Sequence, residues 1–229
     1  MRNAIILCSG GLDSVVTAYY VRKRLRYDKI IILFFNYKQR ALKQERKYSK
    51  ICARKINAEF QEINIQELGR ISDSWINNNN KKINKIKDLK DTKKESERYY
   101  VPCRNSVFLI YAMALAESLE MKTCYKWDIF TGFKNEGKEA YADTTLKYVK
   151  EMNNLIKIST KIKGIIKAPL IKKDKEDIIK FGQDIGVDFR DTFSCYAPKN
   201  NKHCGFCLAC KLRKAGFYWA GIEDITHCS

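Results

Sequence analysis

Short apolar runs alternate with longer amphipathic stretches along most of the chain. The apolar runs are rich in β-branched and aromatic residues, which predicts buried strands at 4–8, 29–35, 58–65, 124–131 and 165–168. The stretches between them have helical spacing, which predicts helices at 12–25, 41–56, 106–119, 142–158 and 175–185, the last ending at Gly186. Continuous apolar strands that alternate with helices form a parallel sheet covered on both faces, so the pattern predicts an α/β fold.

Two parts of the chain depart from this alternation. Residues 71–98 are polar and rich in Asn and Lys, which predicts an exposed or mobile loop with room for a short helix, and a candidate lid. From Asp191 onward the chain is rich in Cys and has little periodicity. We therefore expect a domain at 1–190 and a small C-terminal segment at 191–229.

Composition narrows the class of protein. With 229 residues, 45% of them hydrophobic and 12% aromatic, the chain can bury a full core. The net charge of +18 indicates anionic partners such as nucleotides, nucleic acid or an acidic membrane surface, but a general richness in Lys explains it equally well because the Lys residues are dispersed. The apolar start at 4–7 is too short for a signal peptide, and no apolar run is long enough to span a membrane. We therefore expect a cytoplasmic protein whose clustered cysteines bind metal or react, because disulfides are rare in that compartment.

The first strand runs into the loop Ser9–Ser14, with the sequence SGGLDS, and then into a helix. Gly10 and Gly11 let backbone N–H groups approach an anion, and a helix N-terminus favours negative charge. Asp13 would repel a phosphate unless Mg²⁺ lay between them, so the loop predicts a site for phosphates and Mg²⁺. The alternative is a tight turn in which Asp13 caps the helix.

Four cysteines are clustered near the C-terminus, with the spacing of a metal site: Cys195, Cys204, Cys207 and Cys210. Two C-x-x-C spacings match a zinc ion with four thiolate ligands, which would be structural, but an Fe–S cluster or a redox pair is also compatible with the cysteines alone. The adjoining His203 could compete as a ligand, but we expect it to be a surface residue. The other cysteines are expected to be small buried apolar residues: Cys8, Cys52, Cys103, Cys124 and Cys228.

The loop resembles the SGGxDS signature of the PP-loop ATP pyrophosphatases, which cleave ATP between the α and β phosphates. Loop and cysteine spacing together resemble the 7-cyano-7-deazaguanine synthase family, as do four further stretches: FFNYKQRALKQE, VPCRNSVFL, DTFSCY and CKLRKAGF. The matching residues in these stretches include Phe35, Tyr37, Gln39, Arg40, Val101, Pro102, Arg104, Asn105, Phe108, Leu109, Arg213, Gly216 and Phe217. The resemblance covers nearly the whole chain and implies a Rossmann-like fold of the adenine nucleotide α-hydrolase type.

The resemblance also implies an activity. The family converts 7-carboxy-7-deazaguanine, ammonia and ATP into the nitrile through an adenylated acid and an amide, and the product feeds queuosine or archaeosine in tRNA. It uses Mg²⁺ and structural zinc and is commonly a homodimer. A C–N-bond-forming ligase of this kind needs no membrane, and nucleic acid is a possible but not a required partner.

The site residues follow from the same resemblance. The ATP-binding residues would be Cys8, Ser9, Gly10, Gly11, Leu12, Asp13, Ser14, Val15, Val16, Thr17 and Ala18. The catalytic residues would be Ser9, Asp13, Ser14 and Arg104. The substrate-binding residues would be Tyr37, Gln39, Arg40, Arg104, Asn105, Tyr141 and Asp143. The zinc ligands would be the four clustered cysteines. Arg104 would hold developing phosphate charge or the substrate carboxylate, unless it merely starts a helix.

The sequence departs from the family pattern at 132–145, where only Tyr141 and Asp143 match. Cys103 also replaces a glycine, and Ala41 stands where His is common. Two alternatives are open. The departures at 132–145 and the basic charge are compatible with an adenylating enzyme of the same type that has another acceptor, such as a modified tRNA base or a protein-linked group. The net charge of +18 and the four cysteines are compatible with an RNA-binding module with a zinc knuckle, although RNA binding does not need Asp13 between two serines.

Overall fold

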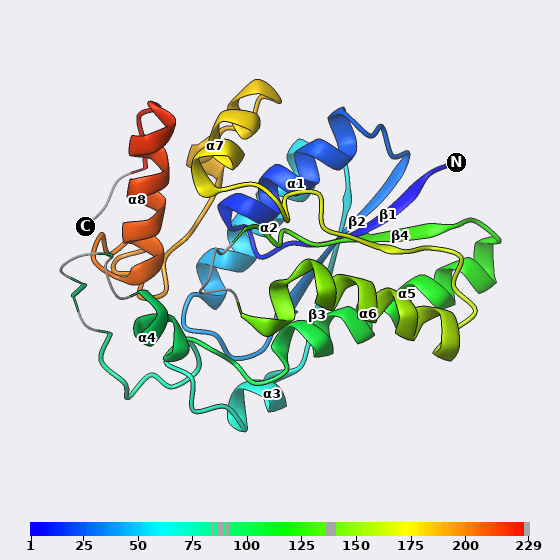
Figure 1. Cartoon of the computed structure of the whole chain (residues 1–229), viewed down its shortest axis with the longest axis horizontal. Coiled ribbons are helices and arrows are strands. Elements are labelled where there is room, and N and C mark those ends of the chain that lie inside the picture. The colour runs from blue at the N-terminus through cyan, green and yellow to red at the C-terminus, as the bar shows by residue number, and fades with distance from the viewer. Residues whose placement is uncertain (84, 87–88, 90–91, 136–140, 227–229) are drawn as a thin grey trace.

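Five parallel strands form the centre of the computed structural model, which describes residues 1–83, 85–86, 89, 92–135 and 141–226 (Figure 1). The strands are β1 (Asn3–Leu7), β2 (Lys29–Asn36), β3 (Glu59–Asn64), β4 (Trp127–Phe130) and β5 (Ile166–Lys167), and their order in the sheet is β3-β2-β1-β4-β5. In the register of the sheet, Ile5 of β1 pairs with Ile31 of β2 and with Ile129 of β4. All the pairings are parallel, which confirms the predicted α/β fold.

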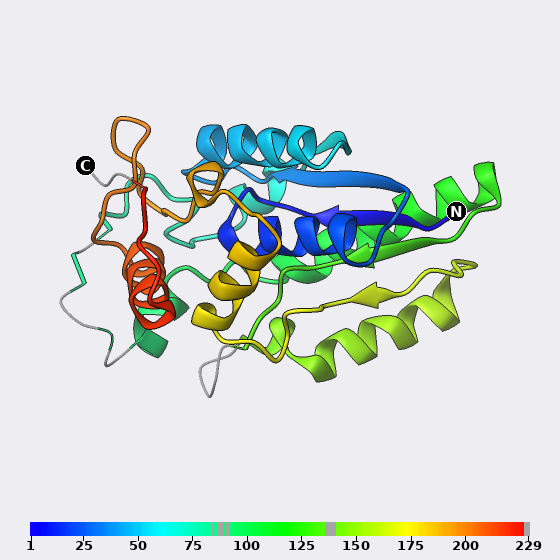
Figure 2. The ribbon, with the colours of Figure 1, turned by 90° about the horizontal axis from the view of Figure 1, so that it is seen from above.

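Helices cover both faces of this sheet. One face packs against α1 (Leu12–Lys23), α2 (Leu42–Lys55) and α7 (Lys175–Asp184), and the other against α5 (Arg104–Thr123) and α6 (Leu146–Ser159). Alternate residues of β1 supply the two cores, since Ile6 lies in the α1 cluster and Ile5 in the α5 cluster, and both are fully buried. Figure 2 shows β5 at one edge of the sheet beside α6.

Shorter elements connect and extend these layers. They are α3 (Gln66–Arg70), α4 (Thr92–Glu97), η2 (Ala142–Thr144), η3 (Phe189–Asp191) and α8 (Leu208–Ala220). α7 packs between α1 and α8 and so connects the C-terminal helix to the layer formed by α1 (Figure 1). Gly216 of α8 permits this contact, because a Cβ there would lie 2.3 Å from the Lys175 side chain.

The strand order reverses at β1, because β2 lies on one side of it and β4 on the other. Ligands of open parallel sheets bind beyond the carboxyl ends of the strands at such a switch point. The loop Ser9–Ser14 follows β1, and Gly132 lies just beyond the end of β4. The fold therefore brings the predicted phosphate loop to the position where a ligand is expected.

Several expectations about local structure were wrong. The stretch 71–98 contains the short helix α4, but it also buries Ser74, Ile76 and Ile83, so it is not simply an exposed loop. Tertiary packing of a few apolar residues outweighs its polar composition. The C-terminal helix α8 was not predicted, since its cysteines mask the helical spacing, and α5 begins at Arg104 rather than at 106. No helix within the described ranges is long and apolar enough to cross a membrane.

Candidate active site and metal centre

The phosphate loop is held from behind by α2. Gly10 has a φ of +75°, and a Cβ there would lie 2.7 Å from the backbone nitrogen of Ser49 and 2.9 Å from the carbonyl oxygen of Glu45. The Ser49 hydroxyl donates a hydrogen bond of 2.8 Å to the carbonyl oxygen of Cys8. Only glycine combines this backbone conformation with so close an approach, so the first glycine of the loop seats it against α2.

The N-terminus of α1 opens toward the end of β4. Its N-cap residue is Gly11, which has no side chain to cap the helix, so the alternative in which Asp13 is the cap is wrong. A Cβ on Gly132 would lie 2.9 Å from the backbone nitrogen of Ser14, so this glycine leaves room beside the first turn. The Ser14 hydroxyl donates to the carbonyl oxygen of Gly11 at 2.9 Å and turns back into the loop. Uncapped N–H groups beside open space form an anion site.

Asp13 forms an ion pair with Lys175, the first residue of α7. Lys175 Nζ lies 2.7 Å from Oδ1 and 2.6 Å from Oδ2 of the carboxylate, and both side chains are half-buried. Sequence reasoning missed Lys175, because it lies 162 positions away and only the packing of α7 on α1 brings it to the loop. The pair places a carboxylate and a cation together beside the anion site.

A cavity of about 330 Å³ extends from the loop across the carboxyl edge of the sheet. It is lined by Cys8, Ser9, Gly11, Asp13 and Ser14 of the loop region, Tyr37 after β2, Glu45 of α2, Arg104, Asn105 and Phe108 of α5, Gly132 and Phe133 after β4, and Tyr196, among others. The cavity therefore joins the anion site to a cationic side chain and several aromatic rings. Its volume suits a small organic ligand.

The Arg104–Asn105 pair opens α5 at the wall of this cavity. The guanidinium carbon of Arg104 lies 6.0 Å from the centre of the Tyr37 ring, and burial raises the pKa of Tyr37 to about 12 although Arg104 lowers it. Cys103, the residue before the helix, has a φ of +54°. This left-handed conformation accounts for the glycine that the family pattern has at this position, because glycine adopts it without strain.

Four of the predicted substrate residues do not line this cavity: Gln39, Arg40, Tyr141 and Asp143. Gln39 is buried, and its amide nitrogen donates to the carbonyl oxygen of Phe35 and to Glu45 Oε2, both at 2.9 Å. Arg40 donates to the carbonyl oxygens of Asn78 and Lys81, and burial lowers its pKa. In this structure Gln39 positions Glu45, and Arg40 holds the segment that follows α3.

The segment that departs from the family pattern is only partly described, because 136–140 lie outside the described residues. Tyr141 donates from its hydroxyl to the carbonyl oxygen of Ser96 at 2.6 Å, and the Asn105 amide donates to the carbonyl oxygen of Asp143 at 3.4 Å. Tyr141 also lines a second hollow of about 250 Å³ on the other side of the loop, together with Lys134 and Lys175. Asp143 of η2 is therefore connected to the start of α5 through Asn105, whereas Tyr141 lies at the second hollow.

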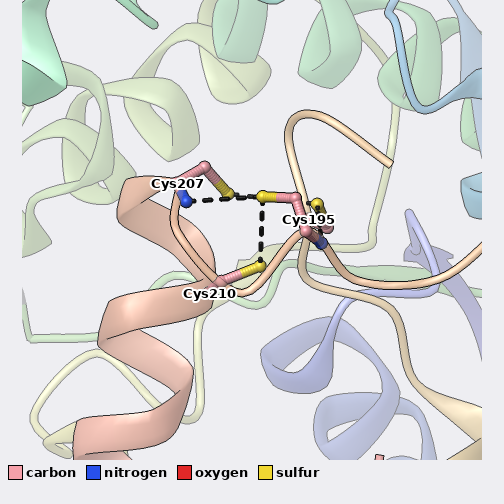
Figure 3. Close-up of side chains that lie close together, drawn as sticks. Cys195, Cys207 and Cys210 are labelled. Carbon is pink, nitrogen blue, oxygen red and sulfur yellow. Dashed lines mark hydrogen bonds between the residues drawn. The ribbon is translucent and has the colours of Figure 1, made fainter. Parts of the chain in front are cut away.

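The four clustered cysteines converge to form a candidate metal centre. Figure 3 shows three of them, Cys195, Cys207 and Cys210, with their sulfur atoms pointing toward one another. Their sulfur atoms lie within 4.8 Å of one another, and the pairs Cys204–Cys210 and Cys195–Cys207 are 3.9 and 4.0 Å apart. A tetrahedral zinc–thiolate centre with Zn–S bonds of about 2.3 Å places its sulfurs about 3.8 Å apart, which fits these distances. Backbone N–H groups donate to Cys195 Sγ at 3.3 Å and to Cys204 Sγ at 3.4 Å, as expected around thiolate ligands.

His203 is buried, so the expectation of a surface residue was wrong. Its ring packs 4.4 Å from the Phe193 ring, and its Nε2 accepts a hydrogen bond of 3.0 Å from the backbone nitrogen of Ser194. Burial lowers its pKa to about 4, so the imidazole is neutral and its Nε2 is occupied. His203 therefore does not compete for the metal through that nitrogen. His203 is buried because it lies in the segment between Cys195 and Cys204, both of which are buried at the metal centre.

Two of the remaining cysteines were also placed wrongly. Cys8 and Cys52 are buried as expected, whereas Cys103 and Cys124 are exposed and each has a positive φ at an end of α5. A predicted strand beginning at 124 therefore starts three residues later, at Trp127. Cys228 lies outside the described residues.

Comparisons with known proteins agree with this geometry. A family model described as queuosine biosynthesis protein QueC matches residues 3–221. A 7-cyano-7-deazaguanine synthase of Methanosphaera stadtmanae is 35% identical over 229 residues, covering 97% of this chain and 96% of its own. One of Rickettsia felis is 33% identical over 227 residues, and one of Nitratiruptor is 35% identical over 223, with 96–98% of each chain covered. A solved NMN synthetase from Francisella tularensis aligns over 97% of this chain and 79% of its own with a TM-score of 0.48 and 14% identity, too distant to support an argument.

Proposed function

The chain belongs to the family of queuosine biosynthesis protein QueC, and from this premise we propose that it makes 7-cyano-7-deazaguanine from 7-carboxy-7-deazaguanine, ammonia and ATP. The observation that carries the proposal is that the cavity beside the phosphate loop joins the anion site at α1 to Arg104 and a set of aromatic rings. One end suits the phosphates of ATP, and the other suits a planar acid.

The first step is adenylation of the acid. The carboxylate oxygen attacks the α-phosphorus of ATP, the bond to the β-phosphate breaks, and pyrophosphate leaves. The uncapped N–H groups of α1, with the hydroxyl groups of Ser9 and Ser14, would hold phosphate oxygens. Lys175 lies beside them and would take the charge that develops on the pyrophosphate, since cations act strongly in a site that excludes water.

The substrate would lie between the Arg104 end and the aromatic walls of the cavity. Phe108 stacks on Phe35 with ring centres 4.1 Å apart and lies 5.3 Å from the Tyr37 ring. A deazaguanine ring fits such a wall, and Arg104 would orient its carboxylate toward the α-phosphate. We assign the amino-pyrimidine edge to the Asp143 region, which Asn105 joins to α5.

Attack of ammonia on the acyl-AMP releases AMP and gives the amide. A second ATP adenylates the amide oxygen, and loss of AMP with a proton from nitrogen gives the nitrile. Each cycle thus removes one carboxylate oxygen from the acid and transfers it to AMP. The enzyme is accordingly an ATP-dependent ligase that forms C–N bonds.

Metal ions would support two parts of this reaction. Asp13 would hold Mg²⁺ together with phosphate oxygens, since Mg²⁺ binds through one or two carboxylates and the substrate phosphates and neutralises their charge when bound. The four cysteines would hold zinc, and four thiolates leave no ligand position open, which makes that ion structural. We propose that 191–229 is a zinc-binding segment attached to a PP-loop domain at 1–190.

The assembly and its compartment are part of the same proposal. We expect a homodimer, as in the family that the sequence resembles. The compartment would be the cytoplasm, where the thiols of Cys103 and Cys124 and the four cysteines of the cluster stay reduced.

Turnover by purified protein tests the proposal. Zinc-loaded protein with the acid, ammonium, ATP and Mg²⁺ should form nitrile, AMP and pyrophosphate, as measured by mass spectrometry, and omission of the acid should stop AMP release. Absence of nitrile under these conditions would contradict the proposal. Formation of AMP with a tRNA base as acceptor, and no change in the free acid, would support the alternative acceptor.

A further inference from the structure

Glu45 lies where the two hollows around the phosphate loop meet. It is in the first turn of α2, directly behind Gly10, and its side chain lines both the cavity that reaches Arg104 and the second hollow beside Lys175. The residue is half-buried. Sequence reasoning did not single it out, although it is the last residue of the stretch FFNYKQRALKQE. A carboxylate in this position faces both sides of the reacting region.

The Glu45 carboxylate is fixed in position by Gln39. Gln39 donates to Glu45 Oε2 at 2.9 Å, and the same Gln39 side chain is anchored to the backbone of Phe35 and Tyr37. Among the residues that the structure describes, Oε1 accepts no hydrogen bond. One oxygen is therefore held while the other is available to a ligand.

Glu45 is the carboxylate of the site that has no cation paired with it in the described part of the chain. Asp13 is the other carboxylate that lines both hollows, and Lys175 pairs with it, whereas no ion pair within the described ranges includes Glu45. Burial raises the pKa of Glu45, while the hydrogen bond from Gln39 and the charge of Arg104 lower it. Tyr37 and Tyr196 line the same cavity, and Lys134 lines the second hollow. Because Glu45 has no paired cation among the described residues, its Oε1 can bind a small cation, and its raised pKa favours the acceptance of a proton from that cation.

We propose that Glu45 is the ammonium site of the enzyme: it binds ammonium through Oε1 and takes one of its protons. This proposal rests on the proposed function. The N–H bond breaks, its proton moves to the Glu45 carboxylate, and the nitrogen lone pair attacks the carbonyl carbon of the acyl-AMP. The C–O bond to AMP then breaks with its electron pair on the phosphate oxygen, and a second proton passes from the nitrogen to water, which gives the neutral amide.

The variant Glu45→Gln tests the assignment, because Gln keeps an oxygen for the Gln39 hydrogen bond and loses the base. Three reactions are compared: acid-dependent exchange of pyrophosphate into ATP, nitrile formation with ammonium, and hydroxamate formation with hydroxylamine. Hydroxylamine is largely neutral near pH 7 and needs no deprotonation. We expect exchange and hydroxamate formation close to the wild-type rates, and nitrile formation lower by about 10²-fold or more. Glu67→Gln is the matched control, since Glu67 is 75% exposed on α3.

The pH profile and the conservative variant separate a base from a structural role. With total ammonium held constant, nitrile formation by the wild type should rise through the raised pKa of Glu45 and then level off, whereas the Gln variant should follow only the concentration of free NH₃, without this inflection. Glu45→Asp should restore part of the rate. Unchanged nitrile formation in Glu45→Gln would overturn the assignment, and so would equal loss of all three reactions in a folded variant. If wild-type protein itself shows no acid-dependent exchange, the proposed function fails instead.

Discussion

Replacing Lys175 by Met probes how the loop handles the leaving pyrophosphate. The change removes both bonds of the Lys175 ammonium group to Asp13, at 2.6 and 2.7 Å, and retains much of the apolar stem. Lys175→Arg keeps the positive charge and is the conservative comparison. Lys180→Met changes an exposed Lys on the same helix and controls for the loss of one positive charge.

The expected loss of stability is modest. Exposed ion pairs contribute about 0–1 kcal/mol and breaking a buried pair costs about 3–5 kcal/mol, so this half-buried pair should contribute about 1–2 kcal/mol to the free energy of unfolding. For a chain of this size the melting temperature should fall by about 2–8 °C. The loss of rate should be larger, since removing one group that stabilises developing charge lowers the rate by about 10²–10³-fold.

Acid-dependent exchange of labelled pyrophosphate into ATP measures this step without ammonia. Lys175→Met should lose about 10²–10³-fold in exchange rate at a temperature where it is folded, whereas Lys180→Met should match the wild type. An exchange rate of Lys175→Met within about threefold of the wild-type rate would refute a role for Lys175 in charge stabilisation, because the loss of one such group lowers the rate by about 10²-fold or more. An equal loss in Lys180→Met would attribute the effect to net charge.

Three further predictions concern the scaffold. Cys207→Ser should release metal, measured by plasma mass spectrometry, and should lower the melting temperature; an unchanged metal content would contradict the four-cysteine centre. Cys103→Gly should raise the free energy of unfolding by about 0.5–1 kcal/mol, as measured by urea titration. The gain is the backbone strain relieved at φ +54° minus the larger conformational entropy of glycine in the unfolded chain. No gain would show that the strain is absent. Burial raises the pKa of Asp224, but the bonds from Arg213 outweigh this effect, so the pKa of the folded state is lowered. The Asp224 carboxylate therefore stabilises the fold fully above the unfolded pKa of about 4, and this stabilisation is lost as the pH falls through the lower folded pKa. Asp224→Asn should therefore flatten the acid limb of stability against pH, and an unchanged limb would contradict this.

Much of the fold is local in origin and could be predicted. The apolar runs of β1 and β2 could be recognised as strands, because strands buried on both faces of a sheet are apolar throughout and show no alternation with polar residues. The loop Ser9–Ser14 and the four cysteines are short motifs whose spacing carries their chemistry. The helix α8 could not be predicted in the same way, because its cysteines serve the metal centre and its buried face was not recognisable as a helical stripe.

The parts of the site that escaped prediction depend on distant contacts. Lys175 meets Asp13 only because α7 packs on α1, and Glu45 enters the cavity only because α2 lies behind Gly10. Gln39 matches the family pattern, yet the structure uses its amide to hold Glu45. A motif can thus identify a residue without telling whether it faces the cavity or supports one that does.

In the proposed function, ATP activates the acid by adenylation, and the carboxylate oxygen passes to AMP. Purified protein is incubated with the acid labelled with ¹⁸O in its carboxylate, together with ammonium, ATP and Mg²⁺. We expect AMP to carry the ¹⁸O label and the nitrile to carry none. Label in inorganic phosphate or in water, with unlabelled AMP, would contradict this mechanism.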